Sequence, residues 1–405
     1  MLLAAAVAVA LAGCGSQSAG AQHPSMARSA PPSASSSTVP TASGTPSATP
    51  TATATPRATP TPPPDPMAGL SLDQRVGQLF MIGTPSTAAS PGTLSDVAAL
   101  HTGGVFLSGP TTAGVSAIAG VTARLRASDH DGVPLLISTD QEGGQVQVLR
   151  GPGFSDIPSA DAQSDWSAAL LRTDAARWAR QLEAAGLDMD LAPVADVIAT
   201  PQQAAANPPI GQLQREYGLG ESAVLPHAQA FEQGMLSAGV VPVVKHFPGL
   251  GAVTANTDFS SGVTDTTTTS TSPSVSVFGA LVGGGAPAVM VSSAVYAQIA
   301  PGGPAVFAPA VVTALLRQRL GFSGLIMTDD VSAARQLAAW TPADRAILAI
   351  EAGVDVVLVS ASPQLAPQMI AAVVAKARAD PAFATQVDAA CEHVLQLKQR
   401  YLERR

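Results

Sequence analysis

Short apolar runs alternate with amphipathic stretches from residue 67 to the end of the chain. Eight of the runs suit a buried strand, and each precedes a stretch with the period of a helix. The expected strands cover residues 78–82, 104–107, 134–139, 189–194, 240–245, 288–292, 325–328 and 354–359. The expected helices cover residues 94–100, 113–126, 167–185, 222–238, 274–281, 309–320, 342–352, 364–378 and 385–403.

Three of the expected helices end in one pattern, in which a glycine follows the helix and a strand begins within three residues. The segments are AAGLD at 184–188, SAGVV at 237–241 and EAGVD at 351–355. Glycine at this position supplies a left-handed helix cap. Short connections of this kind favour a repeated βα unit, and eight units in about 340 residues fit an α/β fold of the (β/α)8 TIM barrel type. A doubly wound open sheet is the alternative, but no G-x-G-x-x-G follows the first strand.

Residues 1–66 do not share this pattern. Residues 1–12 are an apolar run too short to span about 30 Å of hydrocarbon as a helix, which is typical of a secretory signal. Residues 15–66 are dominated by Ser, Thr, Pro and Ala, and they have too few aliphatic side chains to offset the entropy of ordering. We therefore expect a signal peptide at 1–14, a disordered tether at 15–66 and one barrel domain at 67–405.

The segment LAGC at 11–14 resembles the lipobox of bacterial lipoproteins, whose cysteine becomes the lipidated first residue of the mature protein. The resemblance implies an exported chain anchored by a lipid on Cys14 at the extracytoplasmic face of the cell membrane. An ordinary cleaved signal and a membrane anchor left in place are the alternatives. Cys391 is the other cysteine of the chain, so no disulfide is available within the folded part.

The charge of the chain limits its partners. Lys and Arg number 21 against 29 Asp and Glu, which gives a net charge of −8. No basic cluster with interleaved aromatic residues occurs, so nucleic acid is not an expected partner. No group of His, Cys, Asp and Glu has the spacing of metal ligands, so neither a metal nor a cofactor is expected.

Two adjacent carboxylates, Asp329 and Asp330, follow the expected strand at 325–328. Ligands of parallel α/β folds collect at the carboxyl ends of strands, so a carboxylate there can point at a substrate. The alternative for such a pair is one aspartate that caps a helix and one that is solvated.

Other polar side chains follow the third and fifth expected strands. Asp140 begins the segment DQEGGQVQ at 140–147 and can accept hydrogen bonds from the hydroxyls of a ligand. Lys245 and His246 can donate to neighbouring hydroxyls of one ligand, and burying a lysine without such a partner would be costly. A loop with incidental acids and a structural histidine are the alternatives.

Several ordered blocks resemble glycoside hydrolase family 3. LLRQRLGFSGLIMTDD at 315–330 is similar to the active-site signature of that family, which implies that Asp329 is the catalytic nucleophile. DQEGG and KHFPGLG are similar to substrate-binding segments of the family. The resemblance therefore implies that Asp140, Lys245 and His246 bind substrate.

LAPVAD at 191–196 and the following segment at 207–218 are similar to a family block whose arginine binds substrate. Arg215 is the equivalent that the resemblance implies, across two extra residues after Gly211, and Asp196 is expected to order the loop. Related β-N-acetylhexosaminidases usually have arginine where this chain has Val148.

The loop after the fifth strand departs from the family. Its β-N-acetylhexosaminidases carry Asp-Ser-His there, and the histidine is the general acid/base. In NTDFSSG, Asp258 matches the aspartate, Ser260 stands where the histidine would be, and Leu250 replaces the histidine of PGHG. Either Asp258 transfers the proton itself, another acid reaches in, or the protein has lost activity.

Taken together, the sequence is similar to the single-domain bacterial β-N-acetylhexosaminidases of the family, in lipoprotein form. This implies a retaining enzyme that releases terminal β-linked N-acetylglucosamine from peptidoglycan fragments through a glycosyl-enzyme on Asp329. A catalytically silent lipoprotein that binds muropeptides is one alternative. A family member that acts on another β-glycoside is the second.

Overall fold

The computed structural model describes residues 67–129 and 132–403. Cys14 and the expected tether at 15–66 lie outside the described residues, so both remain predictions. Within the described ranges, no helix combines the length and the apolar character that crossing a membrane requires.

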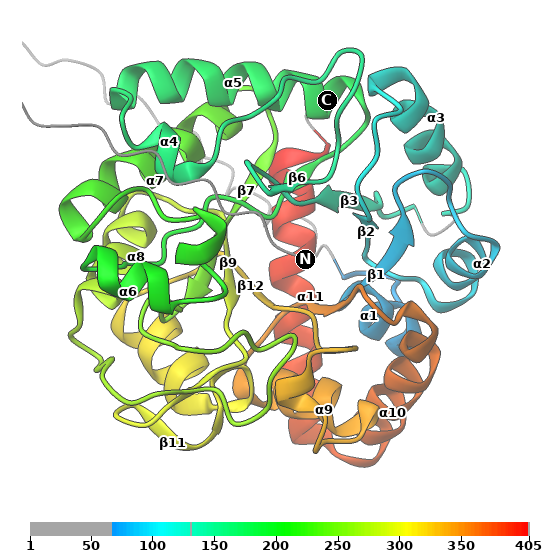
Figure 1. Cartoon of the computed structure of the whole chain (residues 1–405). Coiled ribbons are helices and arrows are strands. Elements are labelled where there is room, and N and C mark those ends of the chain that lie inside the picture. The colour runs from blue at the N-terminus through cyan, green and yellow to red at the C-terminus, as the bar shows by residue number, and fades with distance from the viewer. Residues whose placement is uncertain (1–66, 130–131, 404–405) are drawn as a thin grey trace, which may run out of the picture. The chain divides into compact units, whose positions relative to one another are not determined.

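Eight parallel strands form one sheet whose two edges meet, so the sheet closes into a barrel (Figure 1). The strands are β1 (Phe80–Pro85), β2 (Gly104–Ser108), β3 (Leu136–Thr139), β6 (Met189–Asp190), β7 (Val241–Phe247), β9 (Ala288–Val291), β12 (Leu325–Thr328) and β13 (Val357–Val359). Their order is β12-β9-β7-β6-β3-β2-β1-β13. Between the two edge strands, Met327 pairs with Val356, and the Thr328 N–H donates to the Val356 carbonyl at 2.9 Å. The expected TIM barrel is confirmed.

Helices alternate with these strands along the chain and surround the barrel (Figure 1). The longer ones are α1 (Leu72–Gln78), α2 (Pro91–Leu100), α3 (Val115–Arg126), α5 (Ala168–Ala184), α7 (Glu221–Ser237), α8 (Pro273–Gly283), the π-type helix η3 (Ala310–Arg319), α9 (Pro342–Ala352), α10 (Ala366–Ala379) and α11 (Pro381–Tyr401). The short elements are β4 (Gln141–Gly143), β5 (Val146–Gln147), α4 (Ala160–Gln163), α6 (Pro201–Ala206), η1 (Gly211–Leu213), β8 (Thr264–Asp265), β10 (Val295–Tyr296), β11 (Ala300–Pro304), η2 (Ala305–Phe307), η4 (Arg335–Leu337) and η5 (Pro363–Leu365).

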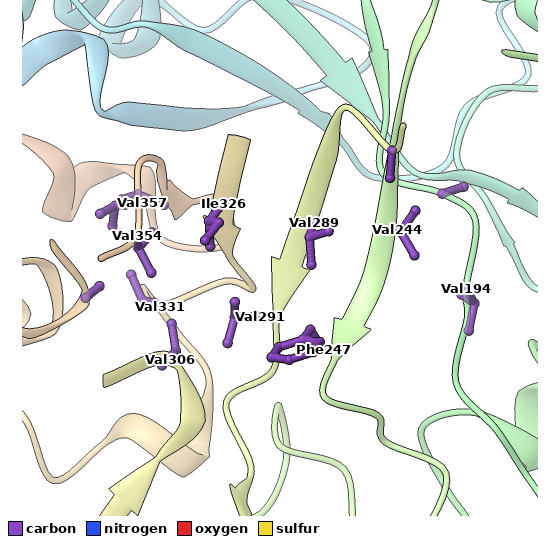
Figure 2. Packing of buried hydrophobic residues seen from close by; sticks show 14 of the residues in the cluster. Val194, Val244, Phe247, Val289, Val291, Val306, Ile326, Val331, Val354 and Val357 are labelled. Carbon is purple, nitrogen blue, oxygen red and sulfur yellow. The ribbon is translucent and has the colours of Figure 1, made fainter. Parts of the chain in front are cut away.

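Alternate residues of each strand point to opposite sides of the barrel wall. Met290 and Met327 belong to a buried cluster inside the barrel. Val244, Val289 and Ile326, from three neighbouring strands, belong to the larger cluster between the strands and the helices (Figure 2). The wall therefore buries apolar side chains on both faces, which explains why the strands have continuous apolar sequences.

Helix α11 lies at the centre of the ring of strands in Figure 1. Its Val394 and Leu397 join the cluster inside the barrel. The buried Lys398 Nζ donates to Gln78 Oε1 at 2.6 Å, just before β1 begins. The helix thus covers the amino-terminal end of the barrel, which leaves the carboxyl-terminal end for a binding site.

Most of the expected strands differ from the observed ones in their limits, and two of these differences have a local cause. Gln78, expected to begin the first strand, ends α1 instead. A capping box starts this helix, because Ser71 Oγ accepts from the Gln74 N–H and Gln74 Oε1 accepts from the Ser71 N–H. Strand β6 stops at Asp190 rather than at residue 194, because Pro193 has no N–H to donate.

The three glycines expected to cap helices do so with a left-handed backbone. Gly186, Gly239 and Gly353 have φ angles of 79°, 80° and 103°. The last of them is also crowded. A Cβ at Gly353 would lie 2.5 Å from Thr313 Oγ1, which donates to the Ala352 carbonyl at 2.7 Å.

We expect Gly353→Ala to lower the free energy of unfolding by about 1–3 kcal/mol, since it strains the backbone and displaces Thr313. Gly120→Ala is the matched control, because Gly120 lies on the exposed face of α3 with no atom within 4 Å of an added Cβ. It should raise stability by up to about 1 kcal/mol. Urea unfolding followed by circular dichroism measures both, and equal stability of the two variants would contradict the assignment.

Candidate active site

A cavity of about 580 Å³ opens at the carboxyl-terminal ends of the strands. The six residues selected from the sequence all line it: Asp140, Arg215, Lys245, His246, Asp258 and Asp329. They come from widely separated segments of the chain, so folding alone brings them together.

Side chains along a strand point alternately to its two faces, and this explains how two of these residues reach the cavity. In β7, Val243 points into the barrel, and Lys245 is the next residue on the same side. In β12, Met327 points inward, and Asp329 follows it by the same two-residue step. Each strand therefore places apolar residues in the barrel interior and one charged residue at its mouth.

A network of charges forms the floor of the cavity. Lys245 Nζ lies 2.6 Å from both Asp140 Oδ1 and Glu142 Oε1. Arg215 holds the same Glu142 carboxylate with two hydrogen bonds of 2.8 Å, from Nε and Nη2. Charge-assisted and bidentate contacts of this kind are among the strongest polar interactions in proteins.

The network keeps its members ionised although they are buried. Burial alone would raise the pKa of Glu142, but the charges of Arg215 and Lys245 outweigh it and lower this pKa to about 2. Burial lowers the pKa of Lys245, and the carboxylates of Asp140 and Glu142 more than reverse that effect, so its pKa is raised. Glu142 was not selected from the sequence, although its position two residues after Asp140 was a signal that both face one side.

Asp196, which follows β6 and was expected to order its loop, holds the loop after β7. Its Oδ2 contacts His246 Nδ1 at 2.7 Å, and its Oδ1 accepts from the Leu250 N–H at 2.6 Å. Arg215 Nη2 lies 3.5 Å from His246 Nε2. The tautomer with a proton on Nδ1 satisfies both ring contacts, because it donates to Asp196 and accepts from Arg215.

The two adjacent aspartates have different surroundings. Asp330 accepts hydrogen bonds from Ser332 Oγ at 2.7 Å, the Ala333 N–H at 2.8 Å and the Ser360 N–H at 2.8 Å. It therefore ties the loop after β12 to the loop after β13. Asp329 accepts the Asp330 N–H at 2.8 Å and lines the cavity beside the ion network.

Asp258 lies across the cavity mouth on the loop after β7. Solvent reaches it, yet desolvation by the cavity walls and the nearby charges of Asp329 and Asp330 raise its pKa to about 6. Leu250 is buried, and among the described residues His246 is the one histidine in the lining. The loop thus presents the carboxyl group of Asp258, rather than a histidine, to the cavity.

Arg150 does not replace the arginine missing at Val148. Its Nη2 donates to the Gly144 carbonyl at 2.7 Å and braces the β4–β5 hairpin, and it does not line the cavity. Within residues 67–129 and 132–403, no group of three His, Cys, Asp or Glu side chains could hold a metal ion.

Comparison with known proteins places this barrel in a family. Residues 71–397 match the glycosyl hydrolase family 3 N terminal domain. The chain belongs to glycosyl hydrolase family 3.

Several proteins that are similar to this chain are named as β-hexosaminidases or β-N-acetylglucosaminidases. The β-hexosaminidase of Stenotrophomonas maltophilia is 34% identical over 248 residues, which cover 59% of this chain and 71% of the relative. The crystal structure of β-N-acetylhexosaminidase from Beutenbergia cavernae is 56% identical, with a TM-score of 0.81 over 82% of this chain and 99% of that one. A family 3 β-N-acetylglucosaminidase from Paenibacillus is 29% identical, with a TM-score of 0.75 over 82% of this chain and 63% of that one.

These likenesses confirm the expected glycosidase of the β-N-acetylhexosaminidase type. The structure brings the selected residues to one cavity of this family 3 barrel. The chemical role of each residue stays a prediction.

We expect Glu142→Gln to lower the free energy of unfolding at pH 7 by about 3–5 kcal/mol, because it leaves two buried cations without their shared carboxylate. The pKa of Glu142 is lowered from 4.5 to about 2 on folding, so its stabilisation is present above pH 4.5 and is lost as the pH falls toward 2. Between pH 7 and pH 3, the free energy of unfolding should therefore fall less in the Glu142→Gln variant than in the unmodified protein.

Glu232→Gln is the matched control with the opposite sign. Glu232 is buried on α7, and burial raises its pKa to about 7. Its ionisation therefore destabilises the fold as the pH rises, and the glutamine variant should be at least as stable as the unmodified protein above pH 7. If both glutamine substitutions changed the free energy of unfolding by the same amount at pH 7, the ion network would not be the source of the destabilisation.

Proposed function

We propose that this family 3 glycosidase releases terminal β-linked N-acetylglucosamine with retention of configuration, using Asp329 as nucleophile and Asp258 as acid and base. The observation that carries the proposal is the pair of carboxyl groups in one cavity. Asp329 stands at the end of β12, and Asp258 faces the same cavity with a pKa raised to about 6. A retaining mechanism needs one ionised and one protonated carboxyl group on either side of the scissile bond.

Asp329 attacks the anomeric carbon of the bound sugar, and the bond from that carbon to the leaving oxygen breaks. The product of this step is a covalent glycosyl-enzyme. Asp330 does not compete for this role, because its carboxylate is occupied by the loop contacts of Ser332 and Ser360.

Asp258 donates a proton to the leaving oxygen and later removes one from the attacking water. A raised pKa suits this work, because an acid with a pKa near 6 is partly protonated near neutral pH. The same residue then acts in both halves of the reaction, and no histidine is required in the loop.

The ion network binds the terminal sugar. Lys245 and Arg215 keep their charges through Glu142, so their remaining N–H groups can donate to sugar hydroxyls. Asp140 is the more exposed carboxylate of the network and can accept from a hydroxyl. His246 is held by Asp196 and completes the polar wall.

The names of the relatives support N-acetylglucosamine as the sugar, since the Paenibacillus neighbour is a β-N-acetylglucosaminidase. Peptidoglycan fragments are the proposed natural substrate, because the sequence of residues 1–66 resembles that of an exported, tethered lipoprotein. Carbohydrate is therefore the principal partner that we propose, with the membrane as the site of anchoring.

Removal of the acid is the sharpest test. We expect Asp258→Asn to slow hydrolysis of a disaccharide by about 10²- to 10⁴-fold, while an activated aryl N-acetyl-β-glucosaminide, whose leaving group needs no proton, forms the glycosyl-enzyme at a rate close to that of the unmodified protein. Azide should speed turnover of the aryl substrate by the Asp258→Asn variant, because azide attacks the glycosyl-enzyme without a base. In the unmodified protein, kcat/KM for the disaccharide should fall above pH 6.

Asp329→Ala is the comparator, and in the absence of azide it should abolish turnover of both substrates. Equal slowing of both substrates by Asp258→Asn, without azide rescue, would restrict Asp258 to loop structure. An unmodified protein that binds N-acetylglucosamine but processes neither substrate would be the silent muropeptide-binding lipoprotein. Turnover of other β-glycosides alone would identify a family member with another substrate.

We also propose that the protein is exported and anchored to the extracytoplasmic face of the cell membrane through a lipid on Cys14. The segment LAGC at 11–14 and the Ser/Thr/Pro/Ala-rich stretch at 15–66 support this. Metabolic labelling with a fatty acid should mark the unmodified protein but not the Cys14→Ser variant. In cell fractionation, the variant should no longer be found in the membrane fraction. Cys391→Ser is the control, because Cys391 is buried in α11 and its loss should not change the labelling. Equal labelling of the Cys14 variant would contradict the anchor.

A further inference from the structure

The loop that carries Asp258 also presents an aromatic ring to the cavity. Phe259 is 79% exposed, the largest value among the bulky apolar side chains of the described residues. Leu170 and Leu219 follow at 47% and 41%, and neither lines the cavity. An exposed aromatic residue at the edge of a polar cavity indicates a surface that a ligand covers.

Hydrogen bonds hold the backbone that carries this ring. Asn256 Oδ1 accepts from the Asp258 N–H at 2.8 Å, and the Asn256 carbonyl accepts from the Phe259 N–H at 3.2 Å. The Asp258 carbonyl accepts from the Arg335 N–H at 3.1 Å. The exposure of Phe259 therefore belongs to a turn tied to η4 rather than to a free loop.

The buried side chain of Gln336 fastens the end of the same loop. Its Oε1 accepts from the Val263 N–H at 2.9 Å, and its Nε2 donates to the Val263 carbonyl at 3.0 Å. The Gln336 N–H donates to the Thr257 carbonyl at 3.0 Å. Contacts on both sides of Phe259 thus fix the backbone position from which its side chain reaches the cavity.

We propose that Phe259 is the platform for the leaving-group sugar, a second pyranose ring next to the terminal one. The inference rests on the proposed function of the same cavity. Lys245 and Arg215 are largely buried in the floor of the cavity, whereas Phe259 is exposed at its edge. A terminal sugar bound on the floor therefore directs its leaving group toward solvent, on the side where Phe259 lies. The ion network of Lys245 and Arg215, in contrast, serves the hydroxyls of the terminal sugar.

The chemistry of the ring selects this occupant. The C–H groups of a pyranose face carry partial positive charge and meet the negative face of an aromatic ring. A platform of this kind adds affinity without specifying each hydroxyl. The enzyme then distinguishes substrates by whether the leaving group is a ring rather than by a set of hydrogen bonds.

Two substrates that differ in the leaving group test the platform. Diacetylchitobiose releases a pyranose, whereas N-acetyl-β-glucosaminyl fluoride releases fluoride, which is no ring and needs no strong acid. We expect Phe259→Ala to lower kcat/KM for the disaccharide about tenfold. The value of kcat/KM for the glycosyl fluoride should stay within about twofold of that of the unmodified protein. Phe259→Tyr should retain the activity toward the disaccharide, because an aromatic ring remains.

Leu170→Ala is the matched control, because it removes an exposed apolar side chain of α5 outside the cavity.

Transfer to a sugar gives a second measurement of the same site. Free N-acetylglucosamine can intercept the glycosyl-enzyme, because its hydroxyl oxygen bonds to the anomeric carbon, the bond to Asp329 breaks, and the hydroxyl proton passes to Asp258. Phe259→Ala should raise the sugar concentration for half-maximal transfer about tenfold. The tyrosine variant should not change it.

If Phe259→Ala lowered kcat/KM equally for both substrates, the ring would serve only the geometry of the loop. If neither kcat/KM nor the transfer reaction changed, no sugar would cover the ring. Either result overturns the platform. Failure of the proposed function looks different, because the unmodified protein would then process neither the fluoride nor the disaccharide.

Discussion

The site depends on two cations that can be buried only because one carboxylate neutralises both. Glu142 bonds to Lys245 and to Arg215 at distances of 2.6 to 2.8 Å. A buried charge without a partner costs several kcal/mol, so each member of the network requires the others. The network joins the segments that follow β3 and β6 to Lys245 near the end of β7. It therefore sets the spacing of neighbouring strand ends as well as the chemistry of the cavity floor.

The opposite wall of the cavity is built without such compensation. The loop of Asp258 is held by backbone and amide hydrogen bonds to Asn256, Arg335 and Gln336. No cation of the floor is placed to neutralise Asp258 fully, and the nearby carboxylates of Asp329 and Asp330 help to raise its pKa to about 6. One wall thus keeps charges ionised, and the other favours a protonated acid. This contrast is what acid and base chemistry in one cavity requires.

Much of the barrel could be predicted from local patterns. Eight apolar runs correspond to the eight barrel strands, and Gly186, Gly239 and Gly353 cap helices where their sequence pattern predicts. Helix α1 was missed because it is only seven residues long, although Ser71 and Gln74 carry its capping signal. Short elements depend on what they pack against, and the periodicity of seven residues is too brief to identify a helix.

Local sequence is sufficient to identify the residues at the ends of strands, because the two-residue period of a strand and the step from apolar to charged residues are both local. These patterns alone place Asp329 and Lys245 at the mouth of the barrel. The partners of each charge, in contrast, follow from the tertiary fold. Glu142 meets Arg215 across 73 positions of sequence. The raised pKa of Asp258 arises from desolvation by the cavity walls and from carboxylates on another strand end. Charge pairing and pKa depend on distance and on exclusion of water, and both exist only once the barrel has closed and brought distant loops to one cavity.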